Sequence, residues 1–123
     1  MKIALGGFSQ GGHLALHVVY GQKLRLGATF SLSSFLCNNS TVFENQRLDE
    51  SPPLFASCGS KDSMVSSKWV QSTVERLQSL GVDVTFSVRP HIGHEIEKQQ
   101  ISQLFTWINK YRNFYLTFNS VQL

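Results

Sequence analysis

The sequence predicts one α/β domain: four mostly parallel strands flanked by helices. Short apolar runs alternate along the chain with longer segments whose apolar residues recur at helical spacing. The chain has 123 residues, which suits a single domain, and its hydrophobic fraction of 41% is enough to form a core. Alternating strands and helices of this length favour a parallel sheet, because each helix can carry the chain back to start the next strand.

Four segments are predicted as strands. The first covers residues 2–5, a short apolar run that ends at two glycines. The second covers 28–32, and the third covers 54–57 and follows two prolines, which are tolerated before a strand but not inside it. The fourth covers 82–89, where apolar and polar residues alternate until Pro90 interrupts them.

Three segments are predicted as helices. Residues 10–20 follow Ser9, a favourable N-cap, and end at a glycine, as helices commonly do. A second helix begins at Ser66 or Ser67 and runs to residue 80, with its apolar side chains on one face. A third helix covers 95–111 and has a similar apolar stripe.

The remaining segments are predicted as irregular. Residues 33–50 are rich in Ser, Asn, Thr and Gln and indicate a long loop with room for one helical turn. Residues 113–123 show no clear period and are assigned as a C-terminal tail, so the domain covers 1–112. In parallel sheets, functional residues gather outside the carboxyl ends of the strands, which directs attention to the residues that follow each strand.

The most specific pattern is Gly7-Phe8-Ser9-Gln10-Gly11, a G-x-S-x-G turn between a predicted strand and a predicted helix. Such a turn strains the backbone of Ser9, and side chains at positions 7 and 11 are expected to collide with neighbouring backbone. The helix dipole favours negative charge near Ser9, and the N–H of Gln10 is a candidate oxyanion donor. The pattern indicates a serine nucleophile; a purely structural glycine turn is the alternative.

A serine nucleophile needs a base that an acid orients, in the chain order Ser, Asp or Glu, then His. Asp62 follows the third strand at its carboxyl end and is the preferred acid, with a turn or capping role as the alternative. Asp49 precedes that strand, at the wrong end of the sheet. Asp83 lies on the polar face of the fourth strand, where a solvated role is expected.

Four histidines are candidates for the base. His91 and His94 both follow the fourth strand, and His94 is preferred because it comes after a glycine and just before the last helix. His13 and His17 lie one turn apart on the first helix, a spacing that suits metal binding. No acidic or cysteine ligand with matching spacing accompanies them, so no metal site is expected.

Charge and composition exclude other classes. The net charge is +3, and the Lys and Arg residues are scattered, so no nucleic-acid partner is expected. No apolar run approaches the roughly 20 residues needed to cross a bilayer, so no stable membrane insertion is expected. Two cysteines, Cys37 and Cys58, do not form a disulfide framework and are expected to be buried, inert thiols, with redox-sensitive or acylated thiols as the alternative. With no secretory leader in sight, a cytoplasmic setting is expected.

The turn and its flanks, Gly6 to Gly12, resemble the nucleophile elbow of the phospholipase/carboxylesterase branch of the α/β-hydrolases, which includes the acyl-protein thioesterases. Further segments resemble the lysophospholipase-like members of that branch, in the same order, over residues 2–112. These segments are Leu32-Ser33-Ser34-Phe35-Leu36, Cys58-Gly59-x-x-Asp62-x-x-Val65, the run 68–81 and Pro90-x-x-x-His94-Glu95.

The resemblance implies a partial α/β-hydrolase fold in which Ser9 is the nucleophile, Asp62 the acid and His94 the base. It implies hydrolysis of acyl thioesters or carboxyl esters through an acyl-enzyme, without a cofactor. The substrates it implies are acylated proteins or small esters. Phe35 and Leu36, after the second strand, are candidates to line an acyl pocket beside Ser9, with core packing as the alternative.

The sequence departs from the family pattern in three respects, one of which is that the tail after Arg112 has no counterpart in the resemblance. Cys58 stands where family members usually have a histidine, which is expected to alter packing more than chemistry. The resemblance also begins at the elbow, whereas family members have upstream strands and a loop that supplies a second oxyanion N–H. We therefore expect a truncated α/β-hydrolase domain whose first strand is an exposed edge open to self-association. The alternative function is a catalytically silent fragment that acts as a binding or regulatory domain.

Overall fold

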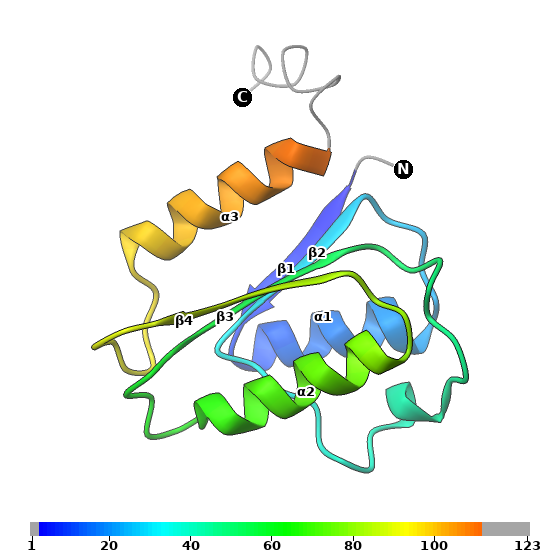
Figure 1. Ribbon diagram of the computed structural model, residues 1–123, viewed down its shortest axis with the longest axis horizontal. Coiled ribbons are helices and arrows are strands. Elements are labelled where there is room, and N and C mark those ends of the chain that lie inside the picture. Colours follow the sequence, from blue (N-terminus) through cyan, green and yellow to red (C-terminus); the bar gives the residue numbers. More distant parts are fainter. Residues whose placement is uncertain (1–2, 112–123) are drawn as a thin grey trace.

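The structure, a computed structural model, describes residues 3–111, in which four strands form one parallel sheet with helices on both faces (Figure 1). The strands are β1 (Ala4–Phe8), β2 (Ala28–Leu32), β3 (Leu54–Gly59) and β4 (Val84–Arg89), in that order across the sheet. The helices are α1 (Gln10–Gly21), α2 (Ser67–Ser79) and α3 (Lys98–Tyr111), with a short 3₁₀ turn, η1 (Thr41–Glu44). The predicted α/β class with four parallel strands is confirmed.

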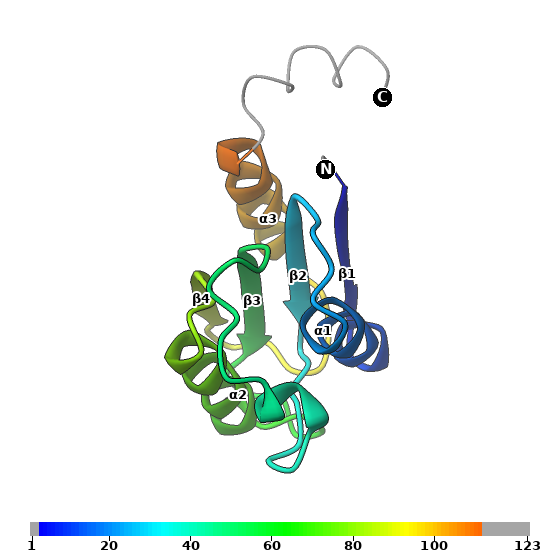
Figure 2. The same ribbon diagram turned by 90° about the vertical axis from the view of Figure 1, so that its right-hand side faces the viewer.

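Two apolar clusters hold the layers together. Helices α1 and α2 cover one face of the sheet and α3 covers the other, as the two views show (Figure 2). Beneath α1 and α2, fully buried side chains such as Leu16, Leu54 and Leu77 form the larger cluster. Beneath α3, a smaller cluster includes Phe55 and Trp107, whose rings lie 5.7 Å apart. Burial of both sheet faces explains why β3 is a nearly continuous apolar run and why the polar residues Thr29 and Ser31 of β2 are also buried.

Strand β1 is longer than predicted, because it continues through the two glycines to Phe8. Gly6 and Gly7 pair with Phe30 and Ser31 of β2. A side chain at Gly6 would begin 2.3 Å from the ring of Phe30, so the glycine lets this ring lie against the strand. Glycine disfavours strands on its own, and pairing with β2 overrides that preference here.

Helix α3 is shorter than predicted, since it begins at Lys98 and not at residue 95. Residues 93–97 instead belong to the loop that contacts the end of β3, as described below. The long loop after β2 contains the expected helical turn: η1 begins after Ser40, whose side chain accepts a hydrogen bond from the Val42 N–H at 3.2 Å. The assigned tail, 113–123, lies outside the described residues.

The β1 edge is open within residues 3–111, as predicted. Strand β1 pairs only with β2 there. Ile3 is 54% exposed and Leu5 is 37% exposed, so apolar side chains flank this edge. None of the helices in the described part of the chain has the length and apolar character needed to cross a membrane.

Tyr20 links α1 to the start of β3. Its side chain is fully buried, and its hydroxyl donates a hydrogen bond to the carbonyl of Pro52 at 2.9 Å. Burial raises the pKa of Tyr20 well above its ordinary value, so the hydroxyl stays protonated and able to donate. This bond anchors the segment that enters the central strand β3.

We expect Tyr20→Phe to lower the free energy of unfolding by about 1–3 kcal/mol, because the buried Pro52 carbonyl loses its donor. Urea denaturation of the variant and the wild type measures this difference. An unchanged midpoint would show that the Pro52 carbonyl finds another partner or does not need one.

Candidate active site

Ser9 lies at a sharp turn between β1 and α1. Its φ of 55° is in the left-handed region, which confirms the predicted strain. Its N–H donates to the carbonyl of Leu32 at 2.8 Å, and its own carbonyl accepts from the Ser34 hydroxyl at 2.8 Å. Ser9 occupies the N-cap position but its side chain makes no capping bond. The turn is thus held from the end of β2, and the Ser9 hydroxyl is available to other groups.

The glycines around Ser9 do not all have the predicted role. A side chain at Gly7 would begin 2.5 Å from the carbonyl carbon of Gly11, as expected. A side chain at Gly11 would meet nothing within 4 Å, so the prediction of a collision at position 11 is wrong. The second crowded glycine is Gly12, where a side chain would begin 2.0 Å from the Ser34 hydroxyl oxygen and 2.7 Å from the Gly7 carbonyl oxygen.

We expect Gly12→Ala to destabilise the protein by about 1–3 kcal/mol, the usual cost of forcing an extra methyl group into a packed site. Gly11→Ala, its neighbour on α1, is expected to be neutral or to stabilise by up to about 1 kcal/mol, because alanine favours a helix. Urea unfolding of both variants measures the two costs. Equal losses would contradict the assignment of the crowded position to Gly12.

The imidazole of His94 connects Ser9 to Asp62. Its Nε2 lies 3.0 Å from the Ser9 hydroxyl oxygen, and its Nδ1 lies 2.7 Å from a carboxylate oxygen of Asp62. An ionised carboxylate only accepts, so Nδ1 carries the proton and Nε2 is left to accept the proton of Ser9. The ring of Phe8 packs 4.8 Å from the imidazole, centre to centre. The residues predicted as nucleophile, acid and base therefore meet in one hydrogen-bonded chain.

The carboxylate of Asp62 is stabilised in its charged form. Burial raises the pKa of this group, but the backbone N–H of Val65, the imidazole of His94 and the backbone N–H of Met64 together outweigh burial, so its pKa lies below the ordinary value. Both N–H groups donate to one carboxylate oxygen at 2.8 Å, which leaves the other oxygen for His94. Asp62 is therefore ionised at neutral pH and orients the imidazole.

Two loops meet to place Asp62 beside His94. The Ser60 N–H donates to the Arg89 carbonyl, and the Lys61 N–H donates to the Ile92 carbonyl, each at 2.9 Å. A side chain at Gly59 would begin 2.3 Å from the Ile92 carbonyl oxygen, so only glycine permits this approach. These contacts were not predicted from the sequence; the glycine at the end of β3 is the signal that could have indicated a close approach.

The competing histidines have other hydrogen-bond partners. His91 shares a loop with His94, but its φ is 66° and its backbone N–H donates to the Ser60 hydroxyl at 3.1 Å. His13 is exposed, and its Nδ1 donates to the carbonyl of Phe35 at 2.8 Å. Among residues 3–111, no group of three or more His, Cys, Asp or Glu side chains is arranged to hold a metal ion.

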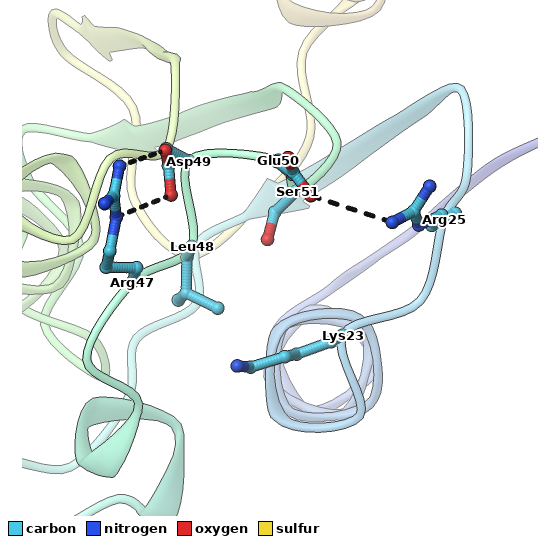
Figure 3. Close-up of a pocket in the computed structure, with 7 residues that line it drawn as sticks. All are labelled: Lys23, Arg25, Arg47, Leu48, Asp49, Glu50 and Ser51. Carbon is cyan, nitrogen blue, oxygen red and sulfur yellow. Dashed lines mark hydrogen bonds and ion pairs between the residues drawn. The ribbon is translucent and has the colours of Figure 1, made fainter.

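Asp49 belongs to a separate pocket near the amino ends of the strands (Figure 3). This pocket has a volume of about 410 Å³ and is lined mainly by charged side chains. Asp49 pairs with Arg47 at 2.7 Å, and Arg25 pairs with Glu50 at 3.6 Å. Asp83 is also at the amino end, directly before β4, where its carbonyl accepts from the Leu54 N–H. Neither carboxylate is placed to orient His94.

Comparison with known proteins decides the family. A family model described as phospholipase/carboxylesterase matches residues 1–112. The chain belongs to this family.

Individual relatives agree with this membership. Lysophospholipase-like protein 1 of Mus musculus is 37% identical over 109 residues, covering 87% of this chain and 46% of the mouse protein. Acyl-protein thioesterase 1 homolog 1 of Dictyostelium discoideum is 31% identical, covering 89% of this chain and 48% of that protein. The crystal structure of SOBER1 from Arabidopsis thaliana has a TM-score of 0.77 at 26% identity, covering 88% of this chain and 52% of that chain. The chain thus spans about half the length of the relatives it matches.

This family member has a cavity of about 280 Å³ beside Ser9. The cavity is lined by Ser9, Gln10, His13, Ser33, Ser34, Phe35 and Val65. Phe35 was a candidate for such a pocket and does line it, and its ring also lies 5.0 Å from that of Trp69. Leu36 was the other candidate, but it is 4% exposed and packs in the larger apolar cluster.

The two cysteines differ from each other. Both are free thiols; Cys58 is buried, as predicted, but Cys37 is exposed, so the prediction that it is buried is wrong. Burial, with a smaller contribution from the nearby Asp62 carboxylate, raises the pKa of Cys58 to about 11. The thiol of Cys58 therefore stays protonated at neutral pH, and the thiolate is the reactive form.

We expect iodoacetamide at pH 8 to alkylate Cys37 in the folded protein and to leave Cys58 unmodified. In urea, Cys58 becomes accessible and is alkylated as well. Mass spectrometry of peptides from both samples measures this selectivity. Modification of Cys58 in the folded protein, at a rate similar to that of Cys37, would contradict its assignment as an inert core residue.

Proposed function

We propose that the protein hydrolyses acyl thioesters or carboxyl esters through an acyl-enzyme formed on Ser9. The observation that supports this best is the hydrogen-bonded chain from Ser9 through His94 to Asp62, with distances of 3.0 and 2.7 Å. The same three residue types, in the same roles, convert an unreactive hydroxyl into a nucleophile in serine hydrolases on unrelated folds. Membership of the phospholipase/carboxylesterase family agrees with this chemistry.

In the first step, the Ser9 hydroxyl oxygen attacks the carbonyl carbon of the substrate while its proton passes to Nε2 of His94. The imidazole becomes positively charged, and the ionised Asp62 stabilises it through the bond to Nδ1. The carbonyl oxygen acquires the negative charge. The nucleophile therefore forms without a free alkoxide, which would be inaccessible at neutral pH.

The backbone N–H of Gln10 is the proposed donor to this oxyanion. Gln10 is the first residue of α1, so its N–H has no acceptor within the helix. The aligned peptides of the 12-residue helix also place partial positive charge at this end. Gln10 lines the cavity beside Ser9, which agrees with a role toward a bound carbonyl.

The second step releases the leaving group and then the acid. His94 returns its proton to the departing sulfur or oxygen, which leaves an ester between the acyl group and Ser9. A water molecule then attacks this ester while His94 takes one of its protons, and the proton finally returns to Ser9. The net reaction consumes one water and yields a carboxylic acid and a thiol or an alcohol.

The proposed substrates are acylated proteins or small esters. The cavity beside Ser9 includes the apolar side chains of Phe35 and Val65, which suit the hydrocarbon part of an acyl group. The relative from Dictyostelium discoideum is named an acyl-protein thioesterase, which favours a thioester bond. A binding or regulatory role without turnover is the second candidate, because the chain spans about half the length of its relatives.

We expect a fluorophosphonate probe to label the folded chain on Ser9, because the probe reacts only with an activated serine. Ser9→Ala is expected to abolish labelling, and His94→Ala to slow it by about a thousandfold or more. His91→Asn is the matched control, because Asn tolerates the positive φ of that position and the imidazole of His91 is not bonded to Ser9. Its labelling rate is expected to equal that of the wild type.

The outcomes separate the candidates. A folded wild-type chain that the probe does not label would reject the hydrolase proposal for this chain and favour a binding role. Labelling that persists in Ser9→Ala would place the nucleophile elsewhere. Loss of labelling in His91→Asn with full labelling in His94→Ala would show that the base is His91.

A further inference from the structure

Helix α3 contacts the sheet through polar as well as apolar side chains. Three of its residues form hydrogen bonds to strand side chains: Gln100 with Ser57 at 3.0 Å, Gln103 with Ser87 at 3.1 Å and Trp107 with Thr85 at 3.1 Å. We call these three pairs the polar seam of α3. Apolar contacts are non-directional and tolerate sliding, whereas hydrogen bonds have a narrow range of distance and angle. The seam therefore fixes where α3 lies along the sheet.

Gln100 is the member of the seam that follows His94 most closely along the chain. Its side chain is 0% exposed, and both ends of its amide are bonded. The Nε2 group donates to the Ser57 hydroxyl on β3, and Oε1 accepts the backbone N–H of Glu97 at 3.0 Å. Gln100 thus joins the central strand to the loop before α3.

Glu97 is a fixed point of that loop. Its N–H is held by Gln100, and its carboxylate pairs with the guanidinium of Arg89 at the end of β4. The other fixed point is Ile92, whose carbonyl accepts the Lys61 N–H at 2.9 Å. His94 lies between these two points, so its imidazole can move only as far as they allow.

The position of Asp62 is set by β3, the same strand that Gln100 bonds. It follows β3, the strand on which Ser57 lies. The residue before it, Lys61, donates its backbone N–H to the Ile92 carbonyl in the His94 loop. The base and the acid are therefore both located relative to β3: the acid by chain continuity, and the base through Gln100 on one side and Ile92 on the other. Loss of the Gln100 hydrogen bonds would free only the Glu97 side of the His94 loop.

We propose that Gln100 is a positioning residue for His94: it holds the His94 loop at the distance from β3 at which the imidazole reaches both Ser9 and Asp62. The proposal rests on the proposed function, since the value of this placement is the activation of Ser9. Gln100 itself touches neither Ser9 nor the cavity beside it. A structural role alone, in which Gln100 only stabilises α3, is the competing explanation.

Gln103 provides the matched control. It has the same side chain and lies on the same helix, and its amide oxygen accepts a hydrogen bond from the Ser87 hydroxyl on the next strand, β4, instead of bonding the loop that carries His94. Gln100→Ala and Gln103→Ala are therefore both expected to lower the unfolding midpoint of the full chain. Only Gln100→Ala is expected to slow fluorophosphonate labelling of Ser9, by about tenfold to a hundredfold, because a displacement near 1 Å has effects of this size. If the wild type is labelled, equal labelling rates in the two variants would overturn the proposal.

Ser57→Ala removes the same link from the strand side and serves if Gln100→Ala does not fold. Its expected labelling rate is as low as that of Gln100→Ala, and the double variant should be no slower than either single one, because all three break one link. Multiplicative losses in the double variant would show that the two residues act separately and would overturn the proposal.

A second measurement separates this inference from the proposed function. The proton on Nδ1 of His94, hydrogen-bonded to Asp62, gives a proton NMR signal that His94→Asn identifies by its loss. We expect Gln100→Ala to shift or broaden this signal and Gln103→Ala to leave it unchanged. If the wild type is not labelled but the signal responds in this way, the hydrolase proposal fails and the positioning role stands. If Gln100→Ala leaves the signal unchanged, the positioning role is wrong, whatever the labelling result.

Discussion

One imidazole sets the main constraint on this structure. His94 must bond the Ser9 hydroxyl with one nitrogen and the Asp62 carboxylate with the other, although 85 residues separate it from Ser9 and 32 from Asp62. The two nitrogens are on opposite sides of a rigid ring, so three loops from different strand ends must lie at fixed mutual distances. A parallel sheet meets this requirement, because the carboxyl ends of β1, β3 and β4 face the same edge.

Close backbone approach is the means by which the loops meet. Gly7 and Gly12 let the turn around Ser9 pack against itself and against Ser34, and Gly59 lets the Asp62 loop touch the His94 loop. At each of these positions a single methyl group would separate segments that the hydrogen bonds join. The strained backbone of Ser9 is retained because Leu32 and Ser34 bond it on both sides. The open edge of β1 does not take part in joining these loops. Self-association through this edge stays a prediction.

Sequence patterns predicted the elements that depend on local order. The four strands, the three helices and the choice of Asp62 and His94 follow from apolar periodicity and from the rule that functional residues follow strands. The errors have tertiary causes. Residues 95–97 continue a helical pattern, but the contacts of Glu97 with Gln100 and Arg89 keep them out of α3. A glycine can indicate a close approach, but its distant partner, such as Ser34 for Gly12, leaves no local signal from which it could be predicted.

Stability and placement come from different parts of α3. Its apolar residues, among them Leu104 and Ile108, are buried against the sheet and supply the free energy that holds the helix there. That energy changes little if the helix slides by a fraction of a side chain, whereas a catalytic arrangement tolerates only about 0.5 Å. A buried amide that is bonded at both ends, as Gln100 is, adds little to stability. Both of its hydrogen bonds form at only one placement of the helix on the sheet. Polar residues beneath a helix are therefore well suited to define the place of the residues that precede it.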